Sequence, residues 1–201
     1  REVGRENADI SARDYRIRLL GVHQVTNALL AATVGSELGV GAEGIREALS
    51  ECPPPEMRLQ VKQVKKKNLT ILEDCYNANR DSMFAALETL AALSTPSRKV
   101  AILGTMGELG DLAESAHLEV SRKAARLNID LVLFCGEYAR RMVTAFESEA
   151  KAGTSAKSFD AVEPLIKEVG SFISDGDCVL VKASRTQQLE RVVQCLEEAQ
   201  S

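Results

Sequence analysis

Short apolar runs alternate with longer amphipathic stretches over most of the chain. Four runs rich in Val, Ile and Leu are predicted to be buried strands: Leu69–Leu72, Val100–Leu103, Leu131–Cys135 and Cys178–Val181. Strands that are apolar on both faces and separated by helix-length segments indicate βαβ units, with a parallel sheet covered by helices on both sides. The intervening helical spacing predicts helices near 81–93, 114–128, 137–150, 161–173 and 186–199.

The first quarter of the chain has a different pattern of apolar and polar residues. Helical spacing of apolar residues predicts one helix from His23 to Leu38 and a shorter one from Ala42 to Ser50. Three successive prolines, Pro53–Pro55, cannot continue a helix, so we expect a domain boundary near residues 52–56.

Two weaker strand signals complete the pattern. The segments 59–64 and 69–75 are predicted to pair as a hairpin around the lysine-rich turn 65–68, which is interpreted as a solvated turn. Ala156–Phe159 predicts a short strand at the edge of the sheet.

Composition restricts the class of protein. The 201 residues are 45% hydrophobic and 27% charged, as in a soluble globular protein, and no apolar stretch approaches the ~18 residues that a membrane span requires. The net charge of −4 argues against nucleic acid or a membrane surface as a partner. Five cysteines without a CxxC pair predict reduced core thiols of a cytoplasmic protein. His23 and His117 lack the spacing of a zinc site and are predicted to be ordinary surface or capped histidines on helices.

Candidate chemistry lies where strands end, because ligands of open α/β sheets bind beyond the carboxyl ends of the strands. Residues 73–79 combine two carboxylates with two asparagines, which suit either a ribose or peptide ligand or ordinary turn and cap chemistry. Residues 104–110 carry three glycines, and Cys135–Glu137 predicts a tight turn. Residues 181–185 place Lys182, Ser184 and Arg185 after the last strand, either to bind an anion or to pair with an acidic neighbour such as Asp74.

Four segments, in this order, resemble motifs of the Mur ligases, the ATP-dependent amide-forming enzymes of peptidoglycan synthesis in cell wall biogenesis. Residues 21–32, GVHQVTNALLAA, are similar to the family pattern GxHNxxNxLAA. Residues 74–83 (DCYNANRDSM), 103–110 (LGTMGELG) and 181–185 (VKASR) are similar to DSYNANPxSM, LGDMxELG and VKGSR, motifs of the branch that adds D-Ala-D-Ala. The positions that differ from the family's usual residues are Gln24, Met57, Arg80, Thr105 and Ala183.

The resemblance implies a domain assignment. Mur ligases have an N-terminal domain for the UDP-sugar, a central ATPase domain and a C-terminal Rossmann-like domain that closes over ATP. By this resemblance, residues 1–52 are the end of the central domain and residues 56–201 are the C-terminal domain. The implied fold class is α/β: a Rossmann-like, mostly parallel sheet with helices on both faces, preceded by a small, mainly helical remnant.

The same resemblance implies a nucleotide site. Asn27 would face the adenine, Arg58 would reach the ATP phosphates, Asp74 would hold the ribose and Asn77 would help to frame the nucleotide. The sequence has no GxxxxGK(S/T) phosphate loop and does not begin with Met. We therefore expect the phosphate loop and the ligands of Mg²⁺ in an upstream part of a longer protein, together with its N-terminal and ATPase domains.

The substrates implied are UDP-MurNAc-tripeptide and D-Ala-D-Ala, and the residues implied near the peptide are Asn79, Lys182, Ser184 and Arg185. The implied reaction is phosphorylation of the tripeptide carboxylate by ATP, followed by attack of the D-Ala-D-Ala amine. No catalytic residue is assigned to this chain, so we expect it to be inactive alone. Two alternatives remain: another superfamily ligase, of the folylpolyglutamate or cyanophycin synthetase type, or a non-catalytic binding or regulatory module derived from a Mur ligase.

Overall fold

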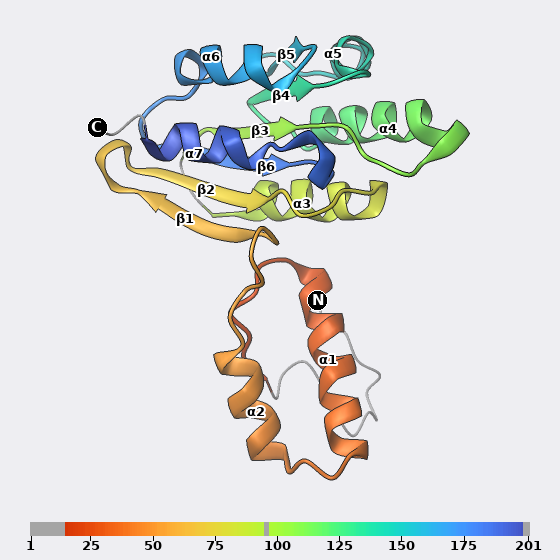
Figure 1. The fold of residues 1–201 in the computed structure, drawn as a ribbon, viewed down its shortest axis with the longest axis vertical. Helices are drawn as coiled ribbons and strands as arrows, with labels where there is room; N and C mark the ends of the chain where they lie inside the picture. The colour runs from red at the N-terminus through yellow and green to blue at the C-terminus, as the bar shows by residue number, and fades with distance from the viewer. Residues whose placement is uncertain (1–14, 95–96, 199–201) are drawn as a thin grey trace. The chain divides into compact units, whose positions relative to one another are not determined.

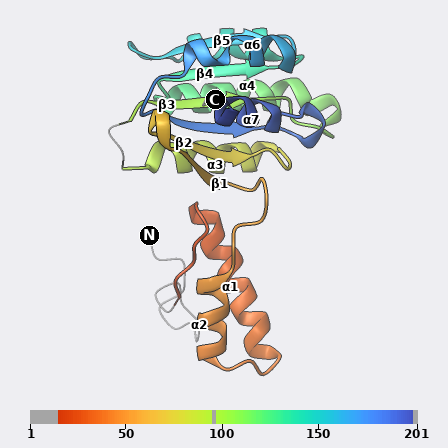
Figure 2. The ribbon, with the colours of Figure 1, turned by 60° about the vertical axis from the view of Figure 1, so that its left-hand side comes forward.

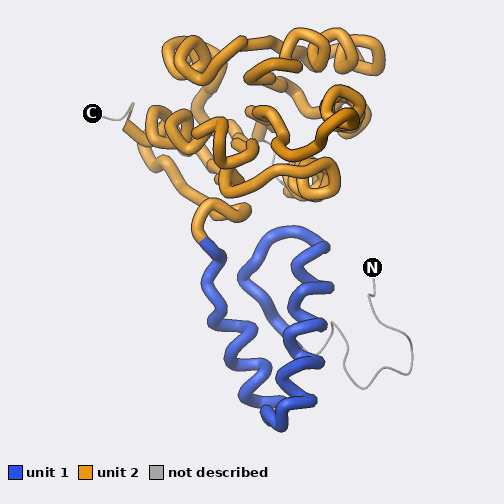
Figure 3. Tube along the Cα trace, turned by 45° about the vertical axis from the view of Figure 1, so that its right-hand side comes forward, with its two compact units in different colours: residues 1–55 blue, residues 56–201 orange. Residues whose placement is uncertain are grey.

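A computed structural model of the chain describes residues 15–94 and 97–198. The chain divides into two compact units, residues 1–55 and residues 56–201 (Figure 3). No helix in the described ranges is both long and apolar enough to cross a membrane.

The first unit is a pair of helices in its described part. Helix α1 spans Val22–Glu37 and helix α2 spans Ala42–Glu51, close to the predicted ranges. They contact each other around Ala28, Ala32 and Ile45, which are the buried apolar residues of this pair. Ile45 lies directly over Gly35 of α1, where a Cβ would be at 3.5 Å, an ordinary van der Waals distance.

The second unit is built on a six-stranded sheet in the order β1-β2-β6-β3-β4-β5 (Figure 1). The strands are β1 (Gln60–Val64), β2 (Leu69–Asp74), β3 (Lys99–Leu103), β4 (Leu131–Cys135), β5 (Ser155–Phe159) and β6 (Cys178–Lys182). Among the strands of the described ranges, only β1 is antiparallel to its neighbour; it forms the predicted hairpin with β2, and the four remaining neighbouring pairs are parallel. The predicted edge strand near residue 156 is confirmed as β5.

The connecting helices close to the predicted ranges are α3 (Arg80–Ala92), α4 (Ala113–Arg126), α5 (Ala139–Glu147) and α6 (Val162–Phe172). The last helix, α7 (Glu190–Glu198), begins later than the predicted residue 186. A short 3₁₀ turn, Arg185–Gln187, comes first, and Gln188 then takes a left-handed conformation with φ of 51°, which interrupts the helix.

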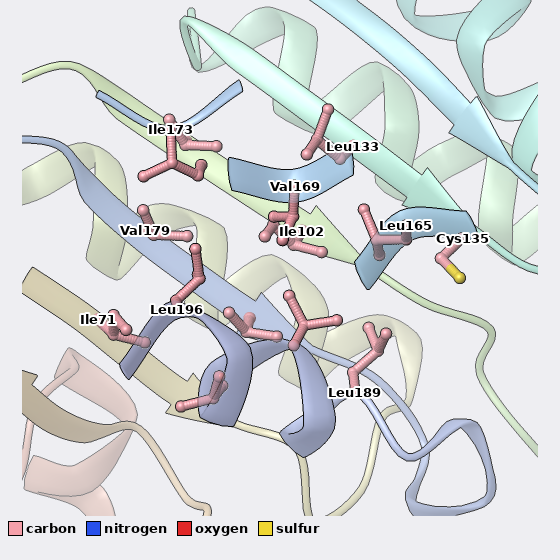
Figure 4. Packing of buried hydrophobic residues seen from close by; sticks show 14 of the residues in the cluster. Ile71, Ile102, Leu133, Cys135, Leu165, Val169, Ile173, Val179, Leu189 and Leu196 are labelled. Atoms are coloured by element: carbon pink, nitrogen blue, oxygen red, sulfur yellow. The ribbon is translucent and has the colours of Figure 1, made fainter. Parts of the chain in front are cut away.

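One face of the sheet packs against α6 and α7. Alternate strand residues such as Ile102, Leu133 and Val179 meet Val169 of α6 and Leu196 of α7 in a buried apolar cluster (Figure 4). The edge strand β5 joins the same layer through Phe159, whose ring meets Phe172 of α6 edge-on at 6.0 Å between centroids.

The opposite face packs against α3 and α4, which the turned view of the ribbon shows on the side away from α7 (Figure 2), and against α5. The next residues along the same strands, such as Leu103 and Phe134, point to this face and are fully buried, as are Leu87 of α3 and Val120 of α4. Phe134 meets Phe146 of α5 edge-on at 6.4 Å. Since strands are apolar on both faces, the predicted fold class, a mostly parallel α/β sheet with helices on both sides, is confirmed.

The cysteines only partly follow the expectation of core thiols. All five are free; Cys75, Cys135 and Cys178 are buried, Cys195 is half-buried, and Cys52 is exposed. Burial, with a smaller effect of Glu163, raises the pKa of the Cys135 thiol from 9.0 to about 11.

Alkylation of the native chain at pH 8 is expected to modify Cys52 and to spare Cys135. A thiol with a pKa of about 11 has roughly a hundredfold less thiolate at pH 8 than one with an ordinary pKa, and burial also blocks the reagent. Time-resolved iodoacetamide labelling with peptide mass spectrometry measures both rates. Equal rates at the two cysteines in folded protein would contradict the buried placement.

The same thiol gives stability a pH dependence of known sign. The folded chain keeps the Cys135 proton at pH values where the unfolded chain has released it. This contribution to the free energy of unfolding is therefore fully present below pH 9.0 and is lost as the pH rises through about 11.

Candidate functional site

The topology makes the carboxyl end of β6 a switch point of the sheet, and the strand ends and following segments here are called the crevice edge. Helix α7, which follows β6, packs on one face of the sheet, whereas α3 and α4, which follow the neighbouring strands β2 and β3, pack on the other. Connections that leave adjacent strands on opposite faces leave a gap at the strand ends, where ligands of open α/β sheets bind. The strand ends are level here, since Asp74, Lys182 and Leu103 are register partners across β2, β6 and β3.

A buried ion pair lies at the centre of this edge. Lys182 Nζ lies 2.7 Å from Asp74 Oδ2, and the side chains of Lys182 and Asp74 are only 2% and 12% exposed. Lys182 Nζ also donates to the Asn77 carbonyl at 2.9 Å, and Asp74 Oδ1 accepts from the Leu59 amide at 3.3 Å. Of the two roles open for Lys182, the structure shows pairing with Asp74, so Lys182 anchors the segment after β2 to β6.

Arg58 lies beside this pair on the segment that leads into β1. Its guanidinium carbon lies 4.3 Å from the centre of the Tyr76 ring, a cation–π contact with an exposed aromatic. Met57 and Leu59 flank it with φ of 58° and 48°, left-handed values that are uncommon for such residues. The Met57 carbonyl accepts from the Tyr76 amide at 3.1 Å, which helps to hold this conformation.

The two asparagines after β2 have different local roles. Asn79 is the N-cap of α3: its side chain accepts from the Ser82 amide at 2.8 Å, and Ser82 Oγ accepts from the Asn79 amide at 3.0 Å. Asn77 is exposed and accepts through Oδ1 from the Ala78 amide at 2.8 Å. The cap interpretation thus holds for Asn79, while Asn77 faces solvent at the crevice edge.

The glycine-rich loop 104–110 packs against the segment after β6. The Gly104 amide donates to the Lys182 carbonyl at 2.9 Å, and the Ser184 amide donates to the Thr105 carbonyl at 3.1 Å. A Cβ at Gly104 would lie 2.7 Å from Ala183 Cβ, so only glycine permits this approach. The loop and the VKASR segment therefore form one surface, although they are far apart in the sequence.

Arg185 extends from this surface. Its side chain is 58% exposed. The Nη1 atom of Arg185 lies against Met57 Sδ and 3.9 Å from Glu190 Oε1. Glu190 Oε2 is buried and has no hydrogen-bond partner within the described residues. The exposed guanidinium of Arg185 is suited to bind a carboxylate group of a ligand.

Asn27 lies on α1 in the other unit, where it is exposed and donates to Gln24 Oε1 at 3.0 Å. The structure therefore brings Arg58, Asp74, Asn77, Asn79, Lys182, Ser184 and Arg185 together around one edge of the second unit, whereas Asn27 belongs to the first unit.

His117 was not singled out from the sequence, and its predicted surface placement is wrong. The side chain is fully buried on α4, where Nε2 accepts from the Met106 amide at 2.8 Å. A signal was present, because His117 falls three residues before Val120 and seven before Ala124 on the apolar stripe of the helix.

Comparison with known proteins identifies the family. The family model described as "Mur ligase, glutamate ligase domain" matches residues 57–185, more than half of the chain. The chain belongs to the Mur ligase family. The matched range contains the whole crevice edge, from Arg58 to Arg185.

Curated Mur ligases resemble this chain over most of its length. A UDP-N-acetylmuramoyl-tripeptide–D-alanyl-D-alanine ligase of Treponema pallidum is 38% identical over 180 residues, which cover 90% of this chain and 38% of that protein. The protein of the same name from Bacillus subtilis is 33% identical over 189 residues, covering 92% of this chain and 40% of the relative. This chain thus spans about two fifths of the length of these relatives.

Solved Mur ligase structures share the fold. A crystal structure of MurF from Acinetobacter baumannii superposes with a TM-score of 0.79 at 28% identity and covers 92% of this chain and 39% of that one. MurF ligase from Thermotoga maritima in complex with ADP superposes with a TM-score of 0.68 at 26% identity and covers 89% of this chain and 38% of that one.

The described part of this Mur ligase chain holds no group of three or more His, Cys, Asp or Glu side chains able to bind a metal ion. Its crevice edge instead offers exposed guanidinium groups, a carboxylate and side-chain amides. This donor set fits phosphate, hydroxyl and carboxylate groups of organic ligands.

Proposed function

We propose that the chain is the C-terminal part of an ATP-dependent amide ligase that joins D-Ala-D-Ala to UDP-MurNAc-tripeptide in peptidoglycan synthesis. The observation that carries the proposal is the likeness to relatives of that name over about 90% of the chain, with three of the four motif segments at one edge of the sheet in the second unit. In this proposal residues 1–52 are the end of the ATPase domain and residues 56–201 are the C-terminal domain.

The nucleotide is ATP in this proposal. Arg58 is exposed and presents the bidentate donors that suit phosphate, and Asp74 keeps acceptor capacity beyond its two partners for ribose hydroxyls. Asn77 frames the nucleotide, and Asn27 supplies the adenine contact from the ATPase part. The ADP complex of the Thermotoga relative supports a nucleotide in this family. Mg²⁺ would be held by residues upstream of this chain.

The peptide substrates lie toward Ser184 and Arg185 in this proposal, where the exposed guanidinium suits a peptide carboxylate. Lys182 and Asn79 act without contacting the substrate: Lys182 holds Asp74, and Asn79 caps α3. This part of the protein positions substrates and closes the site, whereas the phosphate cradle belongs to the upstream part. The five free thiols support the expected cytoplasmic location.

The deciding experiment assays the full-length protein for ATP-dependent ligation with D-Ala-D-Ala and, in parallel, with glutamate. We expect product and ADP only when UDP-MurNAc-tripeptide and D-Ala-D-Ala are both present. Turnover with glutamate alone would favour another superfamily ligase, and no turnover with either amine would favour a non-catalytic module. The 201-residue chain assayed alone is expected to give no product.

Replacing Arg58 with alanine in the full-length protein is expected to raise the KM for ATP by about tenfold or more, since a charge-assisted contact with phosphate contributes about 1.5–3 kcal/mol. The matched control is Arg140→Ala. Arg140 is an exposed arginine of α5 that pairs with Asp160 at 2.7 Å on the surface. Equal KM values for the two variants would remove Arg58 from the nucleotide site.

A further inference from the structure

We propose that His117 is a positioning residue: through one hydrogen bond to the Met106 amide it holds the glycine-rich loop 104–110 in place at the crevice edge. His117 has no part in nucleotide or peptide binding in the proposed function. The inference therefore adds a residue that acts through the loop.

The two ring nitrogens have fixed and different roles. Nδ1 lies 2.5 Å from the Ala113 carbonyl, which can only accept, so Nδ1 carries the proton. Nε2 must then be the bare nitrogen, and it accepts from the Met106 amide at 2.8 Å. Only the neutral ring protonated at Nδ1 satisfies both partners.

Packing fixes the plane of the ring as well. Tyr138, in the turn between β4 and α5, stacks on His117 with ring centroids 4.5 Å apart and planes 27° from parallel. The imidazole is thus held by its own helix, by the loop after β3 and by the turn after β4. A side chain clamped on three sides sets the position of whatever its remaining nitrogen binds.

The Nε2 atom of His117 binds the middle of the loop 104–110. Met106 is buried, its neighbour Thr105 accepts from the Ser184 amide, and a Cβ at Gly107 would lie 3.1 Å from Ser184 Oγ. A shift of the loop at Met106 therefore moves the backbone against which Ser184 rests. His117 in this way sets the crevice edge without touching a ligand.

Protonation would oppose this arrangement. A proton on Nε2 would face the Met106 N–H, so that two donors meet, and it would place a charge in the core. Burial lowers the pKa of His117 below 6.5, opposed by the Ala113 carbonyl and by Glu137 in the turn after β4. The ring is therefore expected to stay neutral at neutral pH.

The first test uses the 201-residue chain and needs no activity. Nitrogen-15 NMR of the imidazole is expected to show the proton on Nδ1 and no titration near pH 6.5. The amide of Met106 is expected to exchange slowly, and His117→Leu should speed its exchange at least about tenfold relative to amides of strand β3. A proton on Nε2, or unchanged exchange in His117→Leu, would overturn the proposal.

Two matched variants separate positioning from loss of packing. His117→Gln keeps an acceptor that can reach the Met106 amide and is expected to restore most of its protection. Ser121→Ala removes another buried polar contact of α4, the one to the Met142 carbonyl, and is expected to leave Met106 protected. Failure of the glutamine to protect better than leucine, or equal loss in Ser121→Ala, would contradict a specific tether.

The consequence for catalysis rests on the proposed function. In the full-length ligase, His117→Leu is expected to lower kcat/KM for D-Ala-D-Ala at least about tenfold, with partial rescue by His117→Gln. Wild-type protein without ligase activity would refute the proposed function but leave the exchange result standing. Normal kcat/KM in His117→Leu alongside lost Met106 protection would refute only the positioning role.

Discussion

Replacing Lys182 with methionine is expected to lower the free energy of unfolding by about 3–5 kcal/mol, because it leaves the Asp74 carboxylate charged and nearly buried without its partner. The same substitution removes the donor to the Asn77 carbonyl and frees the segment after β2. Urea unfolding at pH 7, with the slope m held in common, measures the change.

The matched control is Lys123→Met. Lys123, on α4, pairs with Glu88 at 2.5 Å, and the side chain of Glu88 is 56% exposed. Solvent screens such a pair and hydrates the carboxylate that remains, so the expected loss is about 1 kcal/mol or less. A loss at Lys182 no larger than at Lys123 would show that burial does not strengthen the dependence on the pair.

A double-mutant cycle with Asp74→Asn tests whether the two charges act together. Removing both charges should cost clearly less than the sum of the two single substitutions, since the double variant leaves no isolated charge behind. Strict additivity would mean that Lys182 stabilises the sheet through packing alone. Within the proposed function, Lys182→Met would also weaken ATP binding through the displaced Asp74.

Replacing Gly136 with alanine is expected to cost about 2–5 kcal/mol. Its φ of +109° is strained for any residue with a Cβ, and a Cβ there would lie 2.3 Å from Thr105 Oγ1. Gly136 makes the tight turn after β4, where its amide donates to the Phe159 carbonyl at 2.9 Å. A shifted turn would therefore also disturb the pairing of β4 with β5.

Gly153→Ala separates the cost of backbone strain from the cost of the steric contact with Thr105. Gly153 has a similar φ of +90°, but a Cβ at this position would meet no atom within 4 Å, so only the backbone strain of about 1–3 kcal/mol applies. Adding Thr105→Ala to Gly136→Ala should recover the steric part and bring the loss down to that of Gly153→Ala. Equal losses for the two single glycine variants would show that the contact with Thr105 is relieved at no cost.

The strands were predictable because their cause is local. The runs at Val100–Leu103 and Leu131–Cys135 are apolar at every position, and this pattern alone indicates a strand covered on both faces. The start of α7 was not predictable, because the left-handed turn at Gln188 is the conformation of a single residue and leaves no periodic signal.

The site was also predictable only where its features have a local cause in the sequence. Its residues could be collected from the ends of strands and from the family motifs, but their partners could not. From the sequence, Lys182 could either bind an anion or pair with Asp74, and His117 was predicted to lie at the surface. Neither question could be settled, because both side chains make contacts between segments far apart in the chain.

The sequence by itself determined the secondary structure, the α/β class and the segments that carry polar groups, since periodicity and strand-end chemistry are local properties. Only the tertiary structure decided that β6, the last strand in the chain, lies between β2 and β3. That insertion places Lys182 against Asp74 and Ser184 against the glycine-rich loop. The physical reason is that strand order is set by how whole faces of the sheet are covered by helices, which no short stretch of sequence encodes.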